Sequence, residues 1–261
     1  MQLELDLAMR RVGASILQCR EEGNITGKWK GSQFKAAADL IANEYLRNEL
    51  RLLADIPIIS EEDIISQSMH RPPEYWLIDP IDGTASFAEG FSGFVTQVAL
   101  IQYGQPCLAA VFAPALERLY MAEKGKGATV NGHPMRVRTS SLNALTLIDN
   151  YPQPRGIAEY LFHNLDCVNY LESGSIGLKI CLVAEGKADI FVKDVFVRDW
   201  DVAPPHLVLL EAGGVLTQFA GESFDYDGDY DKRGLVVTSS AALHKQINGI
   251  INNYGSNLWL I

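Results

Sequence analysis

Two aspartates separated by only two residues stand out in the segment WLIDPIDGTASF, residues 76–87. Asp79 and Asp82 follow an apolar run that is typical of a buried strand. In a straight strand, side chains three positions apart point to opposite faces of the sheet. Because Pro80 and Gly83 favour a bend, we expect both carboxylates to turn toward one point. The alternative is simple turn chemistry, in which each aspartate hydrogen-bonds to its own backbone.

Two further acids extend this pattern. Glu61 follows another short apolar segment, and Asp201 follows a tryptophan in the segment WDVA at 200–203. Carboxylates at the edge of a core are costly unless they are paired or bind a cation, and Lys and Arg are scarce around these positions. Oxygen ligands without His or Cys favour Mg²⁺ over Zn²⁺. The sequence therefore predicts a Mg²⁺ site, with the backbone carbonyl of Ile81 as a further ligand.

The Gly83-Thr84 pair predicts a phosphate site beside these ligands. Glycine lets a backbone approach a ligand closely, and N–H groups at the start of a helix attract anions. The Thr84 hydroxyl could also orient a water molecule. The net charge of −10 argues against binding to a nucleic-acid backbone. We therefore expect a small phosphorylated metabolite as the partner, and no nucleic acid.

The composition indicates which class of protein carries this site and where in the cell it is expected. The chain has 261 residues, of which 48% are hydrophobic, so it can bury a sizeable core. No apolar stretch is long enough to span a bilayer, and the first residues are too acidic for a signal peptide. The four cysteines lack the spacing of a zinc site. We expect a cytoplasmic protein that binds no membrane.

The elements that must position the acids are predicted from hydrophobic periodicity and turn signals. Helices are expected at 3–22, 36–53, 156–164, 175–186 and 202–212, and a loop at 23–31. Strands are expected at 56–59, 75–78, 94–102, 107–113, 118–122, 127–130, 145–149, 167–171, 188–192, 215–219 and 234–238. No linker interrupts this order. We expect one domain over 1–261, with metal motifs in about 1–140 and a part of about 141–261 that completes the site.

Several motifs, in order along nearly the whole chain, resemble the inositol monophosphatase family. They are AAAD at 36–39, SEED at 60–63, DPIDGT at 79–84, GSIGLKICLVAEGKAD at 174–189, WDVA at 200–203 and LLEAGG at 209–214. The resemblance implies a mixed α/β (α+β) fold, an α-β-α-β-α sandwich of the inositol monophosphatase and fructose-1,6-bisphosphatase type. It also implies a homodimeric, Mg²⁺-dependent and Li⁺-sensitive phosphomonoesterase.

The metal ligands follow from the same resemblance. Glu61, Asp79 and the Ile81 carbonyl would hold a first ion. A second ion would be held by Asp79, Asp82 and Asp201. Through water, Glu61 would also contact a weaker third ion. Two or three Mg²⁺ ions are therefore expected, with Li⁺ as an inhibitor.

The resemblance also assigns the catalytic residues Thr84, Asp39 and Glu61. Asp39 would hydrogen-bond to Thr84, and this pair would polarise a metal-bound water that attacks phosphorus in line, without a covalent intermediate. Phosphate and substrate contacts are expected from Asp82, Gly83, Thr84, Gly174, Ser175, Asp194 and Asp201.

The substrate is less sharply defined. Inositol monophosphate is favoured because Phe87, Gly90 and Phe94 follow DPIDGT, and because Asp194 occupies the place of an acid that binds sugar hydroxyls. SEED and Lys179 instead resemble bacterial 3′(2′),5′-bisphosphate nucleotidases, which usually carry Lys-Glu where this chain has Ala-Ser after DGT. Histidinol phosphate and a non-catalytic regulatory role are further alternatives.

Several positions have a simpler interpretation or depart from the family pattern. Lys179 is interpreted as a solvated or snorkelling helix residue rather than a ligand, and Asp194 could be plain surface charge. Ala36 replaces a usual threonine. The pair Pro204-Pro205 replaces Ala or Gly, so we expect a shifted helix start with both prolines in the first turn.

Overall fold

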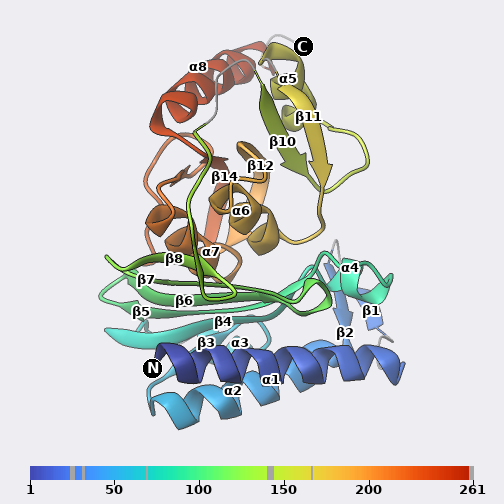
Figure 1. The fold of residues 1–261 in the computed structure, drawn as a ribbon, viewed down its shortest axis with the longest axis vertical. Coiled ribbons are helices and arrows are strands. Elements are labelled where there is room, and N and C mark those ends of the chain that lie inside the picture. Colours follow the sequence, from blue (N-terminus) through green and yellow to red (C-terminus); the bar gives the residue numbers. More distant parts are fainter. Residues whose placement is uncertain (24–26, 31–32, 69, 140–143, 166, 259–261) are drawn as a thin grey trace.

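The computed structural model describes residues 1–23, 27–30, 33–68, 70–139, 144–165 and 167–258. Figure 1 shows five layers, in the order helices, sheet, helices, second sheet and helices. The predicted mixed α/β sandwich with α-β-α-β-α layers is therefore confirmed. The predicted division near residue 140 falls on residues outside the described ranges.

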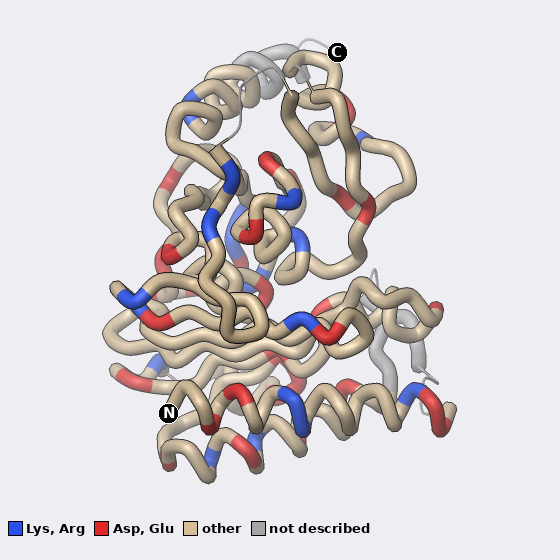
Figure 2. Tube along the Cα trace, viewed as in Figure 1, with Lys and Arg blue, Asp and Glu red and all other residues tan. Residues whose placement is uncertain are grey.

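The first sheet lies within the N-terminal half. Its strands are, in spatial order, β3 (Ile58–Ser60), β4 (Glu74–Asp82), β5 (Val95–Gln102), β6 (Gln105–Ala113), β7 (Arg118–Glu123), β8 (Gly127–Val130) and β9 (His133–Met135). β3 runs parallel to β4, and every other pair is antiparallel. Helices α1 (Gln2–Glu21) and α2 (Ala37–Leu53) cover one face. Both helices carry Lys or Arg as well as Asp and Glu (Figure 2), as expected of an outer layer.

The second sheet lies within the C-terminal half. Its spatial order is β11 (Cys167–Glu172), β10 (Leu145–Asp149), β12 (Ile190–Arg198), β14 (Asp231–Thr238) and β13 (Val215–Thr217). Helices α5 (Ile157–Asn164) and α8 (Ala241–Leu258) cover its outer face (Figure 1). Helices α6 (Ile176–Ala184) and α7 (Asp199–Glu211) lie between the two sheets, where they contact strands of both.

The middle layer forms the largest buried cluster of the molecule. It joins residues of the first sheet, such as Leu77 and Tyr120, to residues of α7 and the second sheet, such as Leu207 and Val237. All four side chains are nearly or fully buried. The two halves of the chain therefore share one hydrophobic core. No helix in the described part of the chain is both long enough and apolar enough to cross a membrane.

Several elements differ from the sequence predictions. The segment expected as a loop contains β1 (Gly27–Lys30), which pairs with β2 (Gln33–Ala36). The short helices α3 (Ile64–Gln67) and α4 (Thr84–Ala88), the 3-10 turn η1 (Pro114–Leu116), β9 and α8 were not predicted.

The helix predicted at 202–212 begins earlier in the structure. Helix α7 begins at Asp199, so Pro204 and Pro205 lie in its second turn rather than its first. The expectation of first-turn prolines is therefore wrong. Because a proline nitrogen cannot donate to the carbonyl four residues earlier, another group must compensate for this loss.

His206 is a buried histidine of α7 that makes stability depend on pH. Its Nδ1 lies 2.7 Å from the hydroxyl of Tyr226, and burial lowers the pKa of His206 to about 4. Below its ordinary pKa, the unfolded chain binds a proton that the folded chain excludes. The contribution of neutral His206 to the free energy of unfolding is therefore fully present above about pH 6.5 and is lost as the pH falls toward 4.

We expect the wild type to lose about 2 kcal/mol more stability between pH 7 and pH 5 than the variant His206→Gln. Urea unfolding at both pH values measures this difference. Burial raises the pKa of Asp199 to about 7, which acts in the opposite direction, but both proteins contain Asp199 and its effect cancels. Identical pH dependences in the two proteins would contradict the assignment to His206.

Candidate metal and phosphate site

The aspartates of β4 lie on one face of the sheet because the strand carries a β-bulge. Asp79 is paired with Gln97 on β5. Asp82 is paired with Val95, so three steps along β4 correspond to two steps along β5. The extra residue brings Asp82 to the face of Asp79 and sends the Ile81 side chain into the core beneath α1 and α2. The predicted bend is therefore present, and a bulge is its cause.

Three carboxylates from three elements meet at this edge of the sheet. The ligand atoms of Glu61, Asp79 and Asp201 all lie within 4.8 Å of one another. Glu61 directly follows β3, whose carboxyl end lies beside that of the parallel strand β4. Asp201 lies in the first turn of α7, where its Oδ2 accepts a hydrogen bond of 2.8 Å from the N–H of Arg198. This all-oxygen set could bind a hard divalent cation such as Mg²⁺.

The electrostatics of these acids also favour a bound cation. Burial raises the pKa of Asp201, and the carboxylates of Asp82 and Glu61 raise it further. Burial likewise raises the pKa of Asp82, against the effect of its hydrogen bonds. Crowded, desolvated carboxylates resist ionisation, and a divalent cation would relieve both the crowding and the desolvation.

Asp82 is not one of the three clustered acids, and its hydrogen bonds lead to helix α6. Its Oδ2 accepts hydrogen bonds from Ser175 Oγ at 2.5 Å and from the Gly177 N–H at 2.6 Å. Both donors lie at the start of α6, where a helix dipole favours a negative charge. Gly174 precedes them and packs so closely on Ser86 that a side chain at this position would overlap the serine hydroxyl. The predicted residues Gly174 and Ser175 therefore lie beside Asp82.

The hydrogen bond predicted between Thr84 and Asp39 is present. Thr84 Oγ1 lies 3.1 Å from Asp39 Oδ1 and 3.0 Å from the carbonyl oxygen of Ile81. Asp39, in the first turn of α2, is only 2% exposed. Gly83 precedes α4 with a φ of 91°, a conformation that favours glycine. The Thr84 hydroxyl has one hydrogen, so when it donates to Asp39 the Ile81 carbonyl oxygen keeps both lone pairs for a cation.

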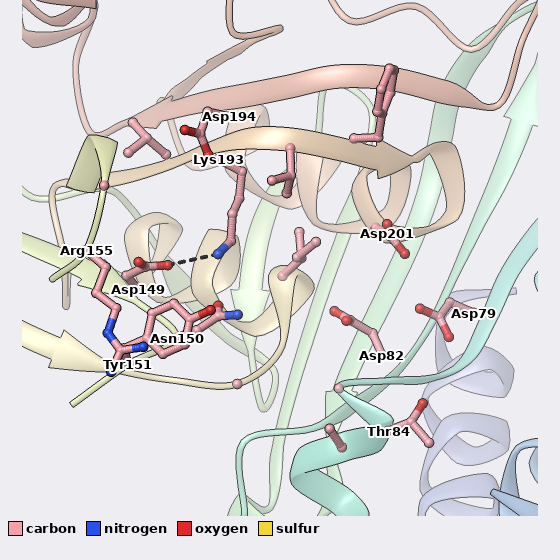
Figure 3. A pocket seen from close by; sticks show the side chains of 18 of the residues that line it. Asp79, Asp82, Thr84, Asp149, Asn150, Tyr151, Arg155, Lys193, Asp194 and Asp201 are labelled. Carbon is pink, nitrogen blue, oxygen red and sulfur yellow. Dashed lines mark hydrogen bonds and ion pairs between the residues drawn. The ribbon is translucent and has the colours of Figure 1, made fainter. Parts of the chain in front are cut away.

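The acids line one end of a cavity of about 590 Å³. Figure 3 shows Asp79, Asp82, Asp201 and Thr84 at one end, and Asp149, Asn150, Tyr151 and Arg155 at the other. The second group lies at the end of β10 and in the loop after it, and sequence reasoning missed it because nothing in the local pattern marks this loop. The predicted residue Asp194 is exposed on the cavity wall. Beside it, Lys193 is paired with Asp149 at 3.1 Å.

The interpretation of Lys179 as a snorkelling side chain is wrong. Lys179 is fully buried, and its Nζ donates to Asn150 Oδ1 at 2.5 Å and to the carbonyl oxygens of Ser173 at 3.0 Å and Gly174 at 3.3 Å. Burial lowers the pKa of Lys179 to about 7, and the charge of Lys193 contributes to this. Lys179 lies on the part of α6 that packs between the two sheets, so its long side chain does not reach solvent. Lys179 instead holds the turn before α6 against the loop after β10.

Arg155, at the far end of the cavity, makes no ion pair with any residue that the structure describes. The guanidinium of Arg155 stacks over the ring of Tyr151, 4.4 Å from its centroid. Both residues are exposed and line the cavity. Their planar groups can accept an anion or a flat ring of a ligand.

A family model described as the inositol monophosphatase family matches residues 3–256. The chain belongs to this family. It is a phosphoric monoester hydrolase, as the sequence predicts. The 3′(2′),5′-bisphosphate nucleotidase CysQ of Shigella flexneri is 34% identical over 196 residues, which cover 73% of this chain and 78% of the relative.

Two further relatives extend the comparison. The Nus factor SuhB of Xylella fastidiosa is 33% identical over 199 residues, covering 72% of this chain and 70% of the relative. The solved structure of the Thermotoga maritima IMPase has a TM-score of 0.82 at 24% identity and covers 98% of both chains. This structural likeness supports the fold assignment.

Proposed function

We propose that the chain is a Mg²⁺-dependent phosphomonoesterase that acts on a 3′(2′),5′-bisphosphate nucleotide. The observation that carries the phosphatase chemistry is the group of Glu61, Asp79 and Asp201 beside the Thr84–Asp39 hydrogen bond. Hydrolysis consumes one water and releases inorganic phosphate and the alcohol of the ester.

The chain's own residues have separate tasks in this reaction. Glu61, Asp79 and Asp201 would hold Mg²⁺, with Asp82 beside them. The bound metal supplies Lewis-acid polarisation of the phosphate and activation of water. Thr84 orients the attacking water, and Asp39 fixes the direction of the threonine hydroxyl. Two or three ions, and inhibition by Li⁺, are part of this proposal.

Three observations support a nucleotide substrate. The cavity extends beyond the acids to Tyr151 and Arg155, and an aromatic ring and a guanidinium suit a base and a second phosphate. Lys179, which the sequence likens to the nucleotidases, hydrogen-bonds to Asn150 of the cavity lining. The CysQ relatives, at about one third identity, are named as bisphosphate nucleotidases.

Inositol monophosphate, the substrate favoured by the sequence, is the second candidate. Asp194 supports it, because this acid lies on the cavity wall where it could accept hydrogen bonds from ring hydroxyls. A homodimer and the absence of nucleic-acid and membrane partners stay predictions. The complete acid set argues against a purely regulatory binding role.

A phosphate-release screen tests the proposal. The substrates are adenosine 3′,5′-bisphosphate, inositol 1-phosphate, fructose 1,6-bisphosphate and histidinol phosphate, each with and without Mg²⁺ and Li⁺. We expect the highest kcat/KM for the bisphosphate nucleotide, only with Mg²⁺, and a decrease on adding Li⁺. Faster hydrolysis of inositol 1-phosphate would favour the second candidate. If no ester is hydrolysed, the proposed function is wrong.

Replacing Arg155 by alanine should change the substrate preference. We expect kcat/KM for adenosine 3′,5′-bisphosphate to fall about 10- to 100-fold, because a charge-assisted pair with the second phosphate is lost. For adenosine 3′-phosphate, which has the same scissile group, the change should stay within about twofold.

Arg51→Ala is the matched control for this charge removal. Arg51 is exposed on α2, about 18 Å along the helix from Asp39 at 1.5 Å per residue. It should affect neither substrate. Equal losses on both substrates in Arg155→Ala would contradict a contact with the second phosphate.

A further inference from the structure

Two consecutive prolines interrupt the hydrogen-bond ladder of α7 directly after Asp201. Pro204 and Pro205 have no N–H, so the carbonyls four residues earlier lose their helical partners. These carbonyls belong to Trp200 and to Asp201 itself. The backbone carbonyl of the proposed metal ligand therefore lacks its usual helical donor at this point.

One side chain from the first sheet replaces both missing donors. Gln97 Nε2 lies 3.0 Å from the carbonyl oxygen of Trp200 and 3.3 Å from that of Asp201. A side-chain amide has two N–H groups, so it can donate to two acceptors at once. Gln97 is fully buried, where an unpaired carbonyl would be costly. Gln97 therefore supplies the two hydrogen-bond donors that the prolines lack.

The position of Gln97 relates this contact to the acids. Gln97 lies directly opposite Asp79 in the pairing of β5 with β4, and directly opposed residues point to the same face of a sheet. On its other side, Gln97 Oε1 packs so closely on the start of α6 that a methyl group at Gly177 would overlap it. The side chain is thus fixed between the first turns of α6 and α7.

We propose that Gln97 is a positioning residue that sets the distance between Asp79 and Asp201. The two acids lie on different elements, and Gln97 joins the strand beside one acid to the backbone of the other. This inference rests on the proposed metal site, because the function of a fixed distance is to hold one cation between the two carboxylates.

The variant Gln97→Met tests the inference, since methionine has a similar volume but no donor. We expect Mg²⁺ to bind about tenfold more weakly by isothermal titration calorimetry, because two hydrogen bonds to buried carbonyls are lost. The Mg²⁺ concentration for half-maximal activity should rise by a similar factor. The kcat at saturating Mg²⁺ should change less, since the assembled site keeps all its ligands.

A second-site rescue separates positioning from a general loss of stability. Adding Pro204→Ala and Pro205→Ala to Gln97→Met restores two backbone N–H groups four residues after Trp200 and Asp201. We expect the melting temperature to recover, whereas Mg²⁺ affinity should stay about tenfold below that of the wild type, because helical N–H groups do not join α7 to β5. Val98→Ala is the matched control, because Val98 is buried on the opposite face of β5 among residues of α1 and α2. It should lower the melting temperature and leave Mg²⁺ affinity unchanged.

Three outcomes would overturn the inference: unchanged Mg²⁺ affinity in Gln97→Met, an equal loss in Val98→Ala, or full recovery of Mg²⁺ affinity with the two alanines. These results differ from a failure of the proposed function, in which the wild type itself binds no Mg²⁺ and releases no phosphate. If the wild type binds Mg²⁺ and Gln97→Met binds it equally well, only the positioning role is wrong.

Discussion

Replacing Asp79 by asparagine should reduce Mg²⁺-dependent phosphate release by about 10³-fold or more. Asp79 is nearly fully buried, and its carboxylate belongs to the cluster with Glu61 and Asp201. Asparagine keeps the shape but loses the charge, and its NH₂ group can point at the neighbouring acids. Initial rates of phosphate release over a Mg²⁺ series measure the effect.

A stability measurement shows that such a loss is not due to misfolding. Without Mg²⁺, the melting temperature of Asp79→Asn should equal or exceed that of the wild type, because one of several repelling buried carboxylates is removed. The rise in melting temperature on adding Mg²⁺ should become smaller. Asp63→Asn is the matched control, because Asp63 caps α3 and lies outside the cluster. Full Mg²⁺-dependent turnover in Asp79→Asn would contradict the proposed metal site.

The second large effect is expected at Thr84. The variant Thr84→Val removes the hydroxyl that lies 3.1 Å from Asp39, and we expect kcat to fall about 10²-fold, because positioned proton acceptors and water-orienting groups typically contribute at least this much. Mg²⁺ affinity measured by calorimetry should change little. Thr84→Ser keeps the hydroxyl and should retain most of the activity.

The Thr84–Asp39 pair should also behave as one unit. Asp39→Asn should lower kcat to a similar extent, and the double variant with Thr84→Val should be no slower than the more damaged single variant. Independent, multiplying losses would show that the two residues act separately. In that case Thr84 would orient water without help from Asp39.

The chain gives local signals for the acids but not for the surroundings of the cavity. Glu61 and Asp79 each follow a short apolar run, and a polar side chain in that position predicts the edge of a core. The hydrogen bond between Asp39 and Thr84 was expected only from a family resemblance, because 45 residues separate the two.

Other features depend on tertiary packing that periodicity does not encode. A helix such as α6, which lies between the two sheets, buries Lys179 although lysine side chains are usually exposed. Gln97 did have a signal, since it is a polar residue inside the apolar strand FVTQVALI at 94–101. The helix α8 was missed because its Gly and Asn residues have low helix propensity, and packing on β14 and α5 supports it instead.

The shared core between the two sheets has a consequence for how this protein would respond to its cation. Asp79 lies in the first sheet and Glu61 directly follows one of its strands, whereas Asp201 belongs to a helix packed on both sheets. An ion bound by all three acids would link the two halves of the chain, and its binding free energy would add to the free energy of unfolding. Substitutions in the core between the two sheets would then destabilise the protein only slightly at high cation concentration and severely at low cation concentration.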